Sequence, residues 1–301
     1  MKDPELGKRW LESLEHQRRL SPRTLENYGR ALDVLLKLKD RTALRELEPQ
    51  QVRHFVARLH AAGLSGRTLA LTLSAWRGLF AWLARQHGYG ANPAQGVRPP
   101  KSPRRLPKAL SVEEAGRLLE GAPPQTPAQA RDRAMFELLY SSGLRLAELV
   151  ALDAEDGRLD LRQAEVTVTG KGRKTRTVPV GSRAREALRD WLKARAQLAR
   201  PGERALFVGA RGERIAPGTV QSRLRAWAKR QGLGASVHPH MLRHSFASHV
   251  LQSSQDLRAV QEMLGHASIS TTQVYTHLDF QYLAKVYDQA HPRAKRKPSK
   301  P

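Results

Sequence analysis

Cysteine is absent from the 301-residue chain, which excludes disulfide bonds and metal sites built on thiolates. Long apolar runs are missing too: no stretch approaches the 18 apolar residues of a membrane-spanning helix. The first residues, Met1-Lys2-Asp3-Pro4-Glu5, hold no apolar core of a signal peptide. We therefore expect a cytoplasmic protein without a membrane span.

Acidic residues are scarce. The chain has 28 Asp and Glu against 52 Lys and Arg, a formal net charge of +24. Such a surplus predicts a polyanionic partner, with nucleic acid as the first candidate. A coding bias towards arginine is the alternative, but it does not explain why acids are few. The surplus is spread along the chain, +11 in residues 1–107 and +13 in residues 108–301.

Residues 1–90 are predicted to form an all-helical domain. Ser21-Pro22 is typical of an N-cap followed by proline in the first helical turn. Apolar residues recur at helical spacing after it, again over residues 51–60, and again after Ser65. Together with the stripe that begins at Trp10, this predicts a bundle of four short amphipathic helices.

Residues 91–107 interrupt the helical pattern with five prolines and four basic residues. Proline removes helical hydrogen bonds and stiffens the backbone. We interpret this segment as an interdomain linker; a long surface loop within one domain is the alternative.

Residues 108–290 are predicted to be mainly helical with a small antiparallel β-sheet, an α+β domain. Ser111 and Glu114 form a capping-box pattern, and the helix over residues 129–140 ends before Gly143, a residue suited to the left-handed conformation. Residues 164–169 and 175–180 alternate as two strands, with Lys171 at the turn between them. Helices are expected over residues 182–198, 216–231, 240–253 and 256–264. Residues 291–301, with five basic residues and no acid, are predicted to form a disordered basic tail.

The helix over residues 240–253 has two useful faces. Leu242, Phe246 and Val250 form an apolar stripe, whereas His240 and Arg243 share another face. A guanidinium matches phosphate oxygens and stays charged, and a neighbouring histidine can donate a hydrogen bond or move a proton near neutral pH. The alternative is that His240 caps the helix and Arg243 is a solvated surface residue.

The histidines around this helix invite a metal-site interpretation, which we disfavour. The set is His238, His240, His244 and His249. No cysteine exists, no carboxylate falls between the first and last of them, and Arg243 would repel a cation.

The next helix ends at Gly265, followed directly by His266, and Tyr275 comes nine residues later. A tyrosine nucleophile needs help to lose its proton, because its ordinary pKa is about 10. Two arginines and a histidine near its hydroxyl would give that help. Taken alone, a tyrosine is more often a packing residue.

Together these motifs resemble the tyrosine recombinase (phage integrase) family over nearly the whole chain. The resemblance implies a SAM-like core-binding DNA-binding domain over residues 1–90 and a catalytic domain over 108–290. Ser142-Gly143-Leu144-Arg145 resembles the first arginine box, and the Gly-Lys-Gly turn resembles the hairpin lysine. His240-Met241-Leu242-Arg243-His244 and Leu264-Gly265-His266 resemble the next two boxes. The implied catalytic residues are Arg145, Lys171, His240, Arg243, His266 and the nucleophile Tyr275.

The C-terminal segment from Leu278 to Arg293 is most similar to the XerC branch of the family. The resemblance to the family implies that the helix from Leu278 onward docks on a neighbouring protomer, for which Leu278, Leu283 and Val286 offer an apolar side. The alternative is that the helix packs on its own domain.

The resemblance implies a chemistry. Tyr275 attacks a phosphodiester and forms a 3′-phosphotyrosyl bond, Arg145 and Arg243 stabilise the charge that develops, and Lys171 protonates the leaving 5′-oxygen. His240 assists proton transfer, and His266 hydrogen-bonds the phosphate. Because the covalent bond keeps the phosphodiester energy, no ATP, metal or other cofactor is expected.

The implied partners are a specific site on double-stranded DNA, a XerD-like recombinase in a heterotetramer, and an FtsK-like DNA translocase, for the resolution of chromosome dimers at cell division. Three rival interpretations stay open: a phage or plasmid integrase, a type IB topoisomerase, and a DNA-binding protein without activity. The last of these would not need the six residues together.

Overall fold

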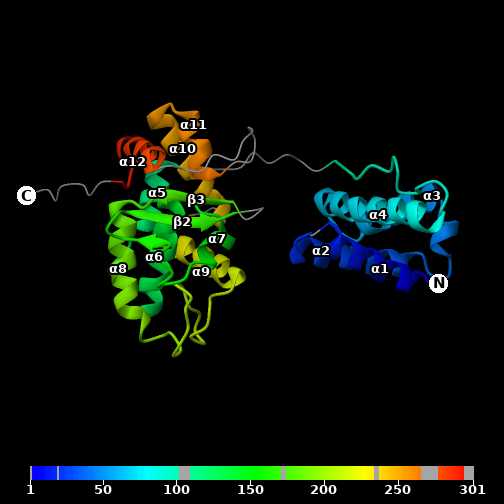
Figure 1. The fold of residues 1–301 in the computed structure, drawn as a ribbon, viewed down its shortest axis with the longest axis horizontal. Coiled ribbons are helices and arrows are strands. Elements are labelled where there is room, and N and C mark those ends of the chain that lie inside the picture. Colours follow the sequence, from blue (N-terminus) through cyan, green and yellow to red (C-terminus); the bar gives the residue numbers. More distant parts are fainter. Residues whose placement is uncertain are drawn as a thin grey trace, which may run out of the picture. The chain divides into compact units, whose positions relative to one another are not determined.

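A computed structural model describes residues 2–18, 20–101, 109–170, 174–233, 237–265 and 277–294, with the backbone alone for residues 277–281. The chain forms two compact units, Met1–Arg105 and Leu106–Pro301 (Figure 1). Each unit has a hydrophobic core of its own. The predicted class, mainly α with a small antiparallel sheet in the second unit, is confirmed.

The N-terminal unit is helical. Its elements are α1 (Asp3–His16), α2 (Pro22–Leu38), the 3-10 turn η1 (Leu44–Glu46), α3 (Pro49–Ala61) and α4 (Gly66–His87). Ser21 and Ser65 cap α2 and α4 by accepting a hydrogen bond from the backbone N–H of the third residue of each helix. Trp76 of α4 is fully buried, and its indole N–H donates to the carbonyl of Ala31 at 2.8 Å. The buried indole thus ties α4 to α2.

The N-terminal unit continues past the expected boundary at residue 90. Ala94 and Val97 are buried in its core, and Arg77 of α4 donates to both of their carbonyls, at 3.1 and 2.5 Å. Asn92 donates in turn to the carbonyl of Arg77. The expected linker of residues 91–107 was therefore placed too early, because proline prevents a helix but not packing. Residues 102–108 lie outside the described residues.

The C-terminal unit holds the sheet and the remaining helices. The strands are β1 (Leu159–Asp160), β2 (Glu165–Thr169) and β3 (Thr175–Pro179), antiparallel in the order β1-β2-β3. Figure 1 shows them as a small sheet among helices. The helices are α5 (Val112–Leu119), α6 (Pro127–Ser141), α7 (Leu146–Val150), α8 (Ser182–Arg195), α9 (Pro217–Arg230), α10 (Pro239–Ser254), α11 (Leu257–Leu264) and α12 (His277–Ala290). The two-residue β1 and the short α7 were not predicted.

Helix α6 is the central element of this unit. It is buried along nearly its whole length and contacts α5, α8, α9 and α10. The chain then turns at Gly143, whose φ of +57° favours glycine. A Cβ there would lie 2.4 Å from Cδ1 of Phe246 on α10. Gly143 thus brings the segment that leads to Arg145 directly against α10.

The C-terminal end of the described chain packs on this unit. Leu283 and Tyr287 of α12 are buried in its core, and the hydroxyl of Tyr287 lies 2.7 Å from Oγ of Ser141. In the single chain, α12 therefore covers its own domain, as in the alternative above, while docking on a second copy stays a prediction.

The predicted disordered tail was wrong at its beginning. His291 and Arg293 are buried, and Arg293 forms an ion pair with Glu137 of α6. Net positive charge did not prevent packing, because a buried carboxylate pairs with one of these basic groups. Residues 295–301 lie outside the described residues.

No helix in the described ranges is both long enough and apolar enough to cross a membrane.

Candidate active site

Arg145 stands at the N-terminal end of α7, two residues after Gly143. Its backbone N–H donates to Oε2 of Glu148 at 2.8 Å, and its Nη1 donates to Oε1 of the same carboxylate at 2.8 Å. Its Nη2 approaches the carbonyl of Gly265 at 3.4 Å. About a third of the side chain stays exposed. The guanidinium is therefore oriented by Glu148 and still open to an incoming group.

Arg243 lies on α10 and is only 8% exposed. Its Nη1 donates to the carbonyl of Gly143 and its Nη2 to that of Leu264, each at 2.5 Å. The alternative that Arg243 is a solvated surface residue is therefore wrong. Among the described residues, two of its five N–H donors have a hydrogen-bond partner.

The charge of Arg243 persists despite its position. Burial lowers its pKa, and the positive charges of Arg145 and Arg176 lower the pKa further, to about 10. A pKa of about 10 keeps the guanidinium protonated at neutral pH. The two arginines predicted from the sequence, Arg145 and Arg243, therefore lie close enough for the charge of Arg145 to lower the pKa of Arg243.

Glu148 and Arg176 complete the cluster, and no role was predicted for either. Arg176 of β3 donates from Nη1 and Nη2 to the two oxygens of Glu148, at 2.7 and 2.8 Å. Burial raises the pKa of Glu148, but the hydrogen bonds from Arg176 and Arg145 outweigh it and lower this pKa to about 2. One signal in the sequence was available: Arg176 alternates with the buried Val178 and Val180, so it points to the core and needs a buried acid.

We call Arg145, Glu148, Arg176 and Arg243 the arginine cluster. Three guanidinium groups surround one carboxylate, which leaves two positive charges without a partner inside the cluster. Because Arg145 is partly exposed, this surplus faces the solvent at one point. Such a surplus with free N–H donors fits an anion with several oxygens, such as a phosphodiester.

His240 is exposed in the first turn of α10, one turn before Arg243. It lies near His238, with 6.4 Å between the ring centroids. His249 belongs elsewhere: it is buried, with its ring nitrogens 2.8 Å from the hydroxyl of Tyr140 and 2.9 Å from the carbonyl of Leu110. In the described part of the chain, no group of three or more His, Cys, Asp or Glu side chains is placed to hold a metal ion.

Lys171, His266 and Tyr275 lie outside the described residues. The residues directly before Lys171 and His266 are described, and both lie at the arginine cluster. A Cβ on Gly170 would come within 3.5 Å of Oε1 of Glu148 and 3.7 Å of Nη1 of Arg145. Gly265, with φ +62°, offers its carbonyl to Arg145. Two of the three chain segments that carry these candidates therefore start beside Arg145.

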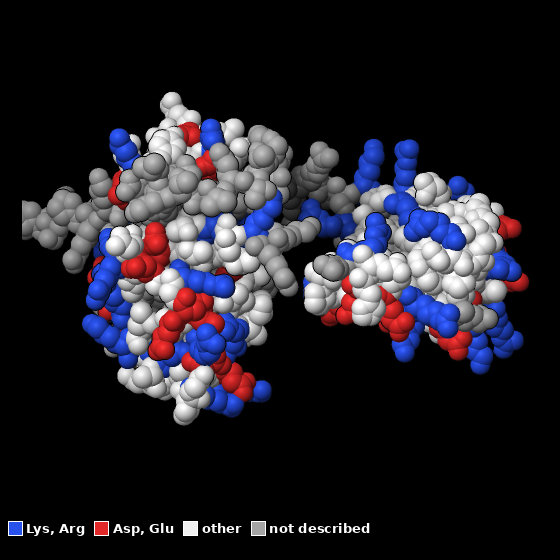
Figure 2. Space-filling model, viewed as in Figure 1, with Lys and Arg blue, Asp and Glu red and all other residues white. Residues whose placement is uncertain are grey.

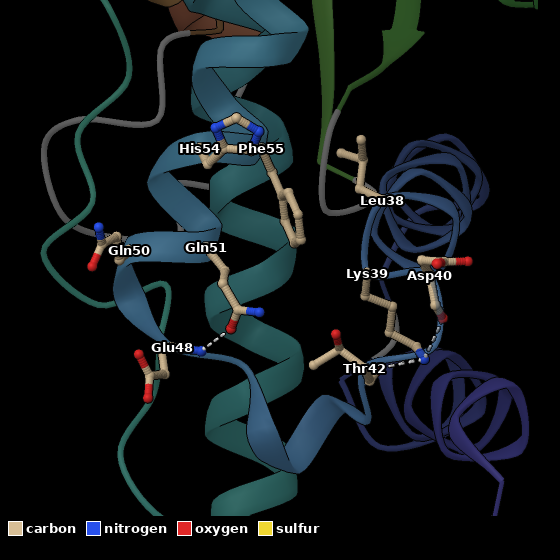
Figure 3. Close-up of a pocket in the computed structure, with 9 residues that line it drawn as sticks. All are labelled: Leu38, Lys39, Asp40, Thr42, Glu48, Gln50, Gln51, His54 and Phe55. Carbon is tan, nitrogen blue, oxygen red and sulfur yellow. Dashed lines mark hydrogen bonds between the residues drawn. The ribbon is translucent and has the colours of Figure 1, made fainter.

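Two other surface features do not involve these residues. Figure 2 shows lysine and arginine side chains over the visible face of each unit, with acidic groups among them. The N-terminal unit has a pocket of about 510 Å³, whose lining residues are drawn in Figure 3. Local hydrogen bonds lie at its edge, from Glu48 N–H to Gln51 at the start of α3 and from Lys39 to the carbonyl of Thr42 just after α2. None of the candidate site residues lines it.

Comparisons with known proteins decide the family. Residues 108–282 match the phage integrase family, and residues 8–87 match the phage integrase N-terminal SAM-like domain. The chain belongs to the phage integrase family. The chain is 55% identical to tyrosine recombinase XerC 1 of Ralstonia nicotianae, over 98% of this chain and 95% of that protein. It is 53% identical to tyrosine recombinase XerC of Pseudomonas aeruginosa (strain LESB58), over 96% and 95%.

A solved structure shares the fold of this phage integrase family member. The XerH site-specific recombinase bound to palindromic difH substrate, a post-cleavage complex, has a TM-score of 0.68 and is 24% identical, over 94% of this chain and 84% of that chain. The family and the class of enzyme predicted from the sequence, a tyrosine recombinase of the XerC type, are confirmed.

Proposed function

We propose that the chain is a XerC-like site-specific recombinase that cuts and rejoins double-stranded DNA through a 3′-phosphotyrosyl bond to Tyr275. The observation that carries this proposal is the arginine cluster. It offers two uncompensated positive charges beside the segments that lead to Lys171 and His266, in a chain 55% identical to a tyrosine recombinase.

The chemical step follows from the charges. The hydroxyl oxygen of Tyr275 attacks the phosphorus, and the bond from phosphorus to the 5′-oxygen breaks. Negative charge builds on the non-bridging oxygens, where Arg145 and Arg243 stabilise it, as oriented donors do in other enzymes. Lys171 gives a proton to the leaving 5′-oxygen, His240 assists proton transfer at Tyr275, and His266 hydrogen-bonds the phosphate.

The reaction needs neither ATP nor a metal ion in this proposal. The phosphotyrosyl bond conserves the energy of the phosphodiester, so the 5′-hydroxyl of a second duplex can attack it and reseal the strand. The positive charge that a metal would supply comes from the two arginines. Arg243 keeps that charge at neutral pH, because its pKa of about 10 is still well above neutrality.

We propose further that both units hold one duplex, with the SAM-like unit (residues 1–90 in the sequence-based division) and the catalytic unit (108–290) joined by the proline-rich segment. The charge surplus of +24 supports this, and it predicts that affinity falls steeply with salt. A XerD-like recombinase in a heterotetramer and an FtsK-like translocase are the partners, in the cytoplasm, for resolving chromosome dimers at cell division.

Covalent trapping tests the function. The wild-type chain and its Tyr275→Phe variant are incubated with a nicked suicide duplex that carries the host's recombination site, with EDTA and without ATP. A parallel reaction adds the XerD-like partner. Denaturing gels then show any protein attached to DNA. Tyr282→Phe is the matched control, because Tyr282 is an exposed tyrosine of the following helix that bonds Asp256.

We expect an adduct from the wild type and from Tyr282→Phe but none from Tyr275→Phe. A dependence on the partner supports the XerC-like assignment. An equal adduct from Tyr275→Phe removes this residue as the nucleophile, and an adduct that EDTA abolishes contradicts the metal-free reaction. Relaxation of supercoiled DNA without strand exchange between duplexes would instead indicate a topoisomerase.

A further inference from the structure

Arg176 is the buried member of the arginine cluster. It is 5% exposed, and three of its donor nitrogens are occupied: Nη1 and Nη2 by Glu148, and Nε by the carbonyl of Met263 at 2.8 Å. A side chain enclosed in this way cannot be the group that contacts a DNA backbone. Its charge must act through its neighbours.

Those neighbours share one carboxylate. Each oxygen of Glu148 accepts two hydrogen bonds, one from Arg176 and one from Arg145. Four donors use the acceptor capacity of a carboxylate fully. If Arg176 were neutral, Arg145 and Glu148 would form a balanced ion pair, and the charge of Arg145 would be compensated inside the protein.

We propose that Arg176 is a positioning residue that neutralises Glu148, so that the positive charge of Arg145 stays available for the phosphate that is cut. This inference rests on the proposed function and deepens it. Glu148 orients Arg145 through two hydrogen bonds, and Arg176 removes the electrostatic cost of using a carboxylate for that task. The net charge of the cluster is the quantity that Arg176 sets.

Arg176 also holds two segments of the site against each other. It lies on β3, two residues after Lys174, in the strand that returns from the turn carrying Lys171. Its Nε donates to Met263 at the end of α11, and a Cβ on Gly265 would lie 3.0 Å from its Cδ. One guanidinium therefore joins the strand of the hairpin, the start of α7 and the turn that leads to His266.

Charge balance separates this role from a merely structural one. Arg176→Met removes one positive charge from the cluster, and Glu148→Gln removes one negative charge. The double variant Arg176→Met/Glu148→Gln restores the net charge of the wild type while losing the ion pair. A structural role predicts that the double variant is no better than the worse single variant. Our proposal predicts that it recovers activity lost in Arg176→Met.

The readout is the rate of covalent attachment to the suicide duplex at saturating protein, with DNA affinity measured separately. We expect Arg176→Met to slow attachment about 10- to 100-fold, less than the loss of a direct phosphate donor. The double variant should be about tenfold faster than Arg176→Met, and Arg176→Lys, which keeps the charge, should lie between Arg176→Met and the wild type.

The matched control is another buried pair of this unit, Arg293 and Glu137. Arg293→Met and Arg293→Met/Glu137→Gln should attach to DNA at the wild-type rate when measured well below their melting temperatures. A double variant of the cluster that is as slow as Arg176→Met, with both folded, overturns the proposal. The proposal is also overturned if Arg176→Lys attaches to DNA no faster than Tyr275→Phe. This second comparison keeps the test decisive if Arg176→Met does not fold.

A second readout does not depend on recombination. Carbon-13 NMR of the glutamate carboxyl groups follows the titration of Glu148, identified by its absence in Glu148→Gln. Among the described residues, the charged groups facing Glu148 are Arg145, Arg176 and Arg243. In Arg176→Met this carboxyl should titrate between pH 3 and 6 (roughly its ordinary range), whereas the wild type should not. If Glu148 titrates in Arg176→Met as it does in the wild type, the proposed role of Arg176 is overturned. If the wild type forms no adduct with the suicide duplex, only the proposed function is contradicted.

Discussion

Two buried carboxylates of the C-terminal unit invite comparison, Glu148 and Glu137. Both belong to helices, both are nearly inaccessible to water, and each receives two hydrogen bonds from the guanidinium of one arginine. Glu148 has Arg145 and Arg243 as further positive neighbours. Glu137 pairs directly with Arg293, which also approaches Glu120 at 3.4 Å, and the charges of Arg133 and Arg183 act on Glu137 as well.

The pKa values of the two carboxyls differ in direction. Burial raises the pKa of Glu137, and the charge and hydrogen bonds of Arg293, with the charges of Arg133 and Arg183, offset this only in part. The pKa of Glu148 is lowered to about 2, because the hydrogen bonds of Arg176 and Arg145 outweigh burial. A balanced pair anchors the C-terminal segment, whereas a surplus of positive charge marks a place suited to bind an anion.

The largest effect on the reaction rate should come from removing one positive charge from the arginine cluster. Arg243→Met is expected to slow covalent attachment to DNA about 10²- to 10³-fold, because a donor to the transition state is lost. Arg293→Met removes a charge from the balanced pair, and the folded protein should react at the wild-type rate. Suicide-substrate kinetics measure both. An equal loss of attachment rate in Arg243→Met and Arg293→Met would contradict the distinction between the arginine cluster and the balanced pair.

The balanced pair, Arg293 and Glu137, should matter for stability rather than for the reaction rate. Arg293→Met leaves the carboxylate of Glu137 buried without its partner, and should lower the free energy of unfolding by about 3 kcal/mol. Urea unfolding of the wild type and the variant measures this. The double variant Arg293→Met/Glu137→Gln should recover part of the loss. A loss below about 1 kcal/mol would mean that the C-terminal segment is not anchored by this pair.

A smaller effect on stability is expected from a substitution in the turn at Gly143, which lies between the arginine cluster and α10. Gly143→Ala places a methyl group 2.4 Å from Phe246 and forces a left-handed backbone, which should cost about 2 kcal/mol. Gly88→Ala is the control, since its φ is similar, +62°, and nothing lies within 4 Å of the added Cβ. Thermal melts should show the greater loss for Gly143→Ala. Similar losses would show that contact with Phe246 does not constrain the turn.

The smallest effect is a change in the acid dependence of stability. The pKa of Glu148 is lower in the folded chain, about 2, than its ordinary value of 4.5. Its contribution to stability is therefore present above about pH 4.5 and is lost as the pH falls towards 2. Glu148→Gln should lose less stability over this range than the wild type, and Glu137→Gln should show no such gain in acid resistance. Unfolding curves from about pH 5 down to about pH 2.5 give the answer.

Local features were predicted well from the sequence. The N-caps at Ser21 and Ser111 and the left-handed Gly143 are present in the structure, because such signals depend on neighbouring residues alone. The apolar stripe of residues 242, 246 and 250 is buried as expected. It anchors α10 and so fixes where Arg243 lies.

Long-range pairing was harder to predict. Arg176 and Glu148 are 28 residues apart, and Arg293 and Glu137 are 156 residues apart, so only the packed fold shows that they meet. Composition misled at Val97 and Arg293: proline and positive charge suggested unpacked segments, yet Val97 is itself buried and bonded by Arg77, and Arg293 pairs with the buried Glu137. The roles of Lys171, His266 and Tyr275 remain predictions.

The most direct measurement is a crystal structure of the Tyr275→Phe chain bound to a duplex with its recombination site. A backbone phosphate should lie within hydrogen-bond distance of the guanidinium groups of Arg145 and Arg243, with the substituted ring at position 275 facing that phosphorus. Arg176 should still hold both oxygens of Glu148 and touch no DNA. A duplex bound with no phosphate at Arg145 and Arg243 would contradict the assignment of the arginine cluster as the site of strand cleavage.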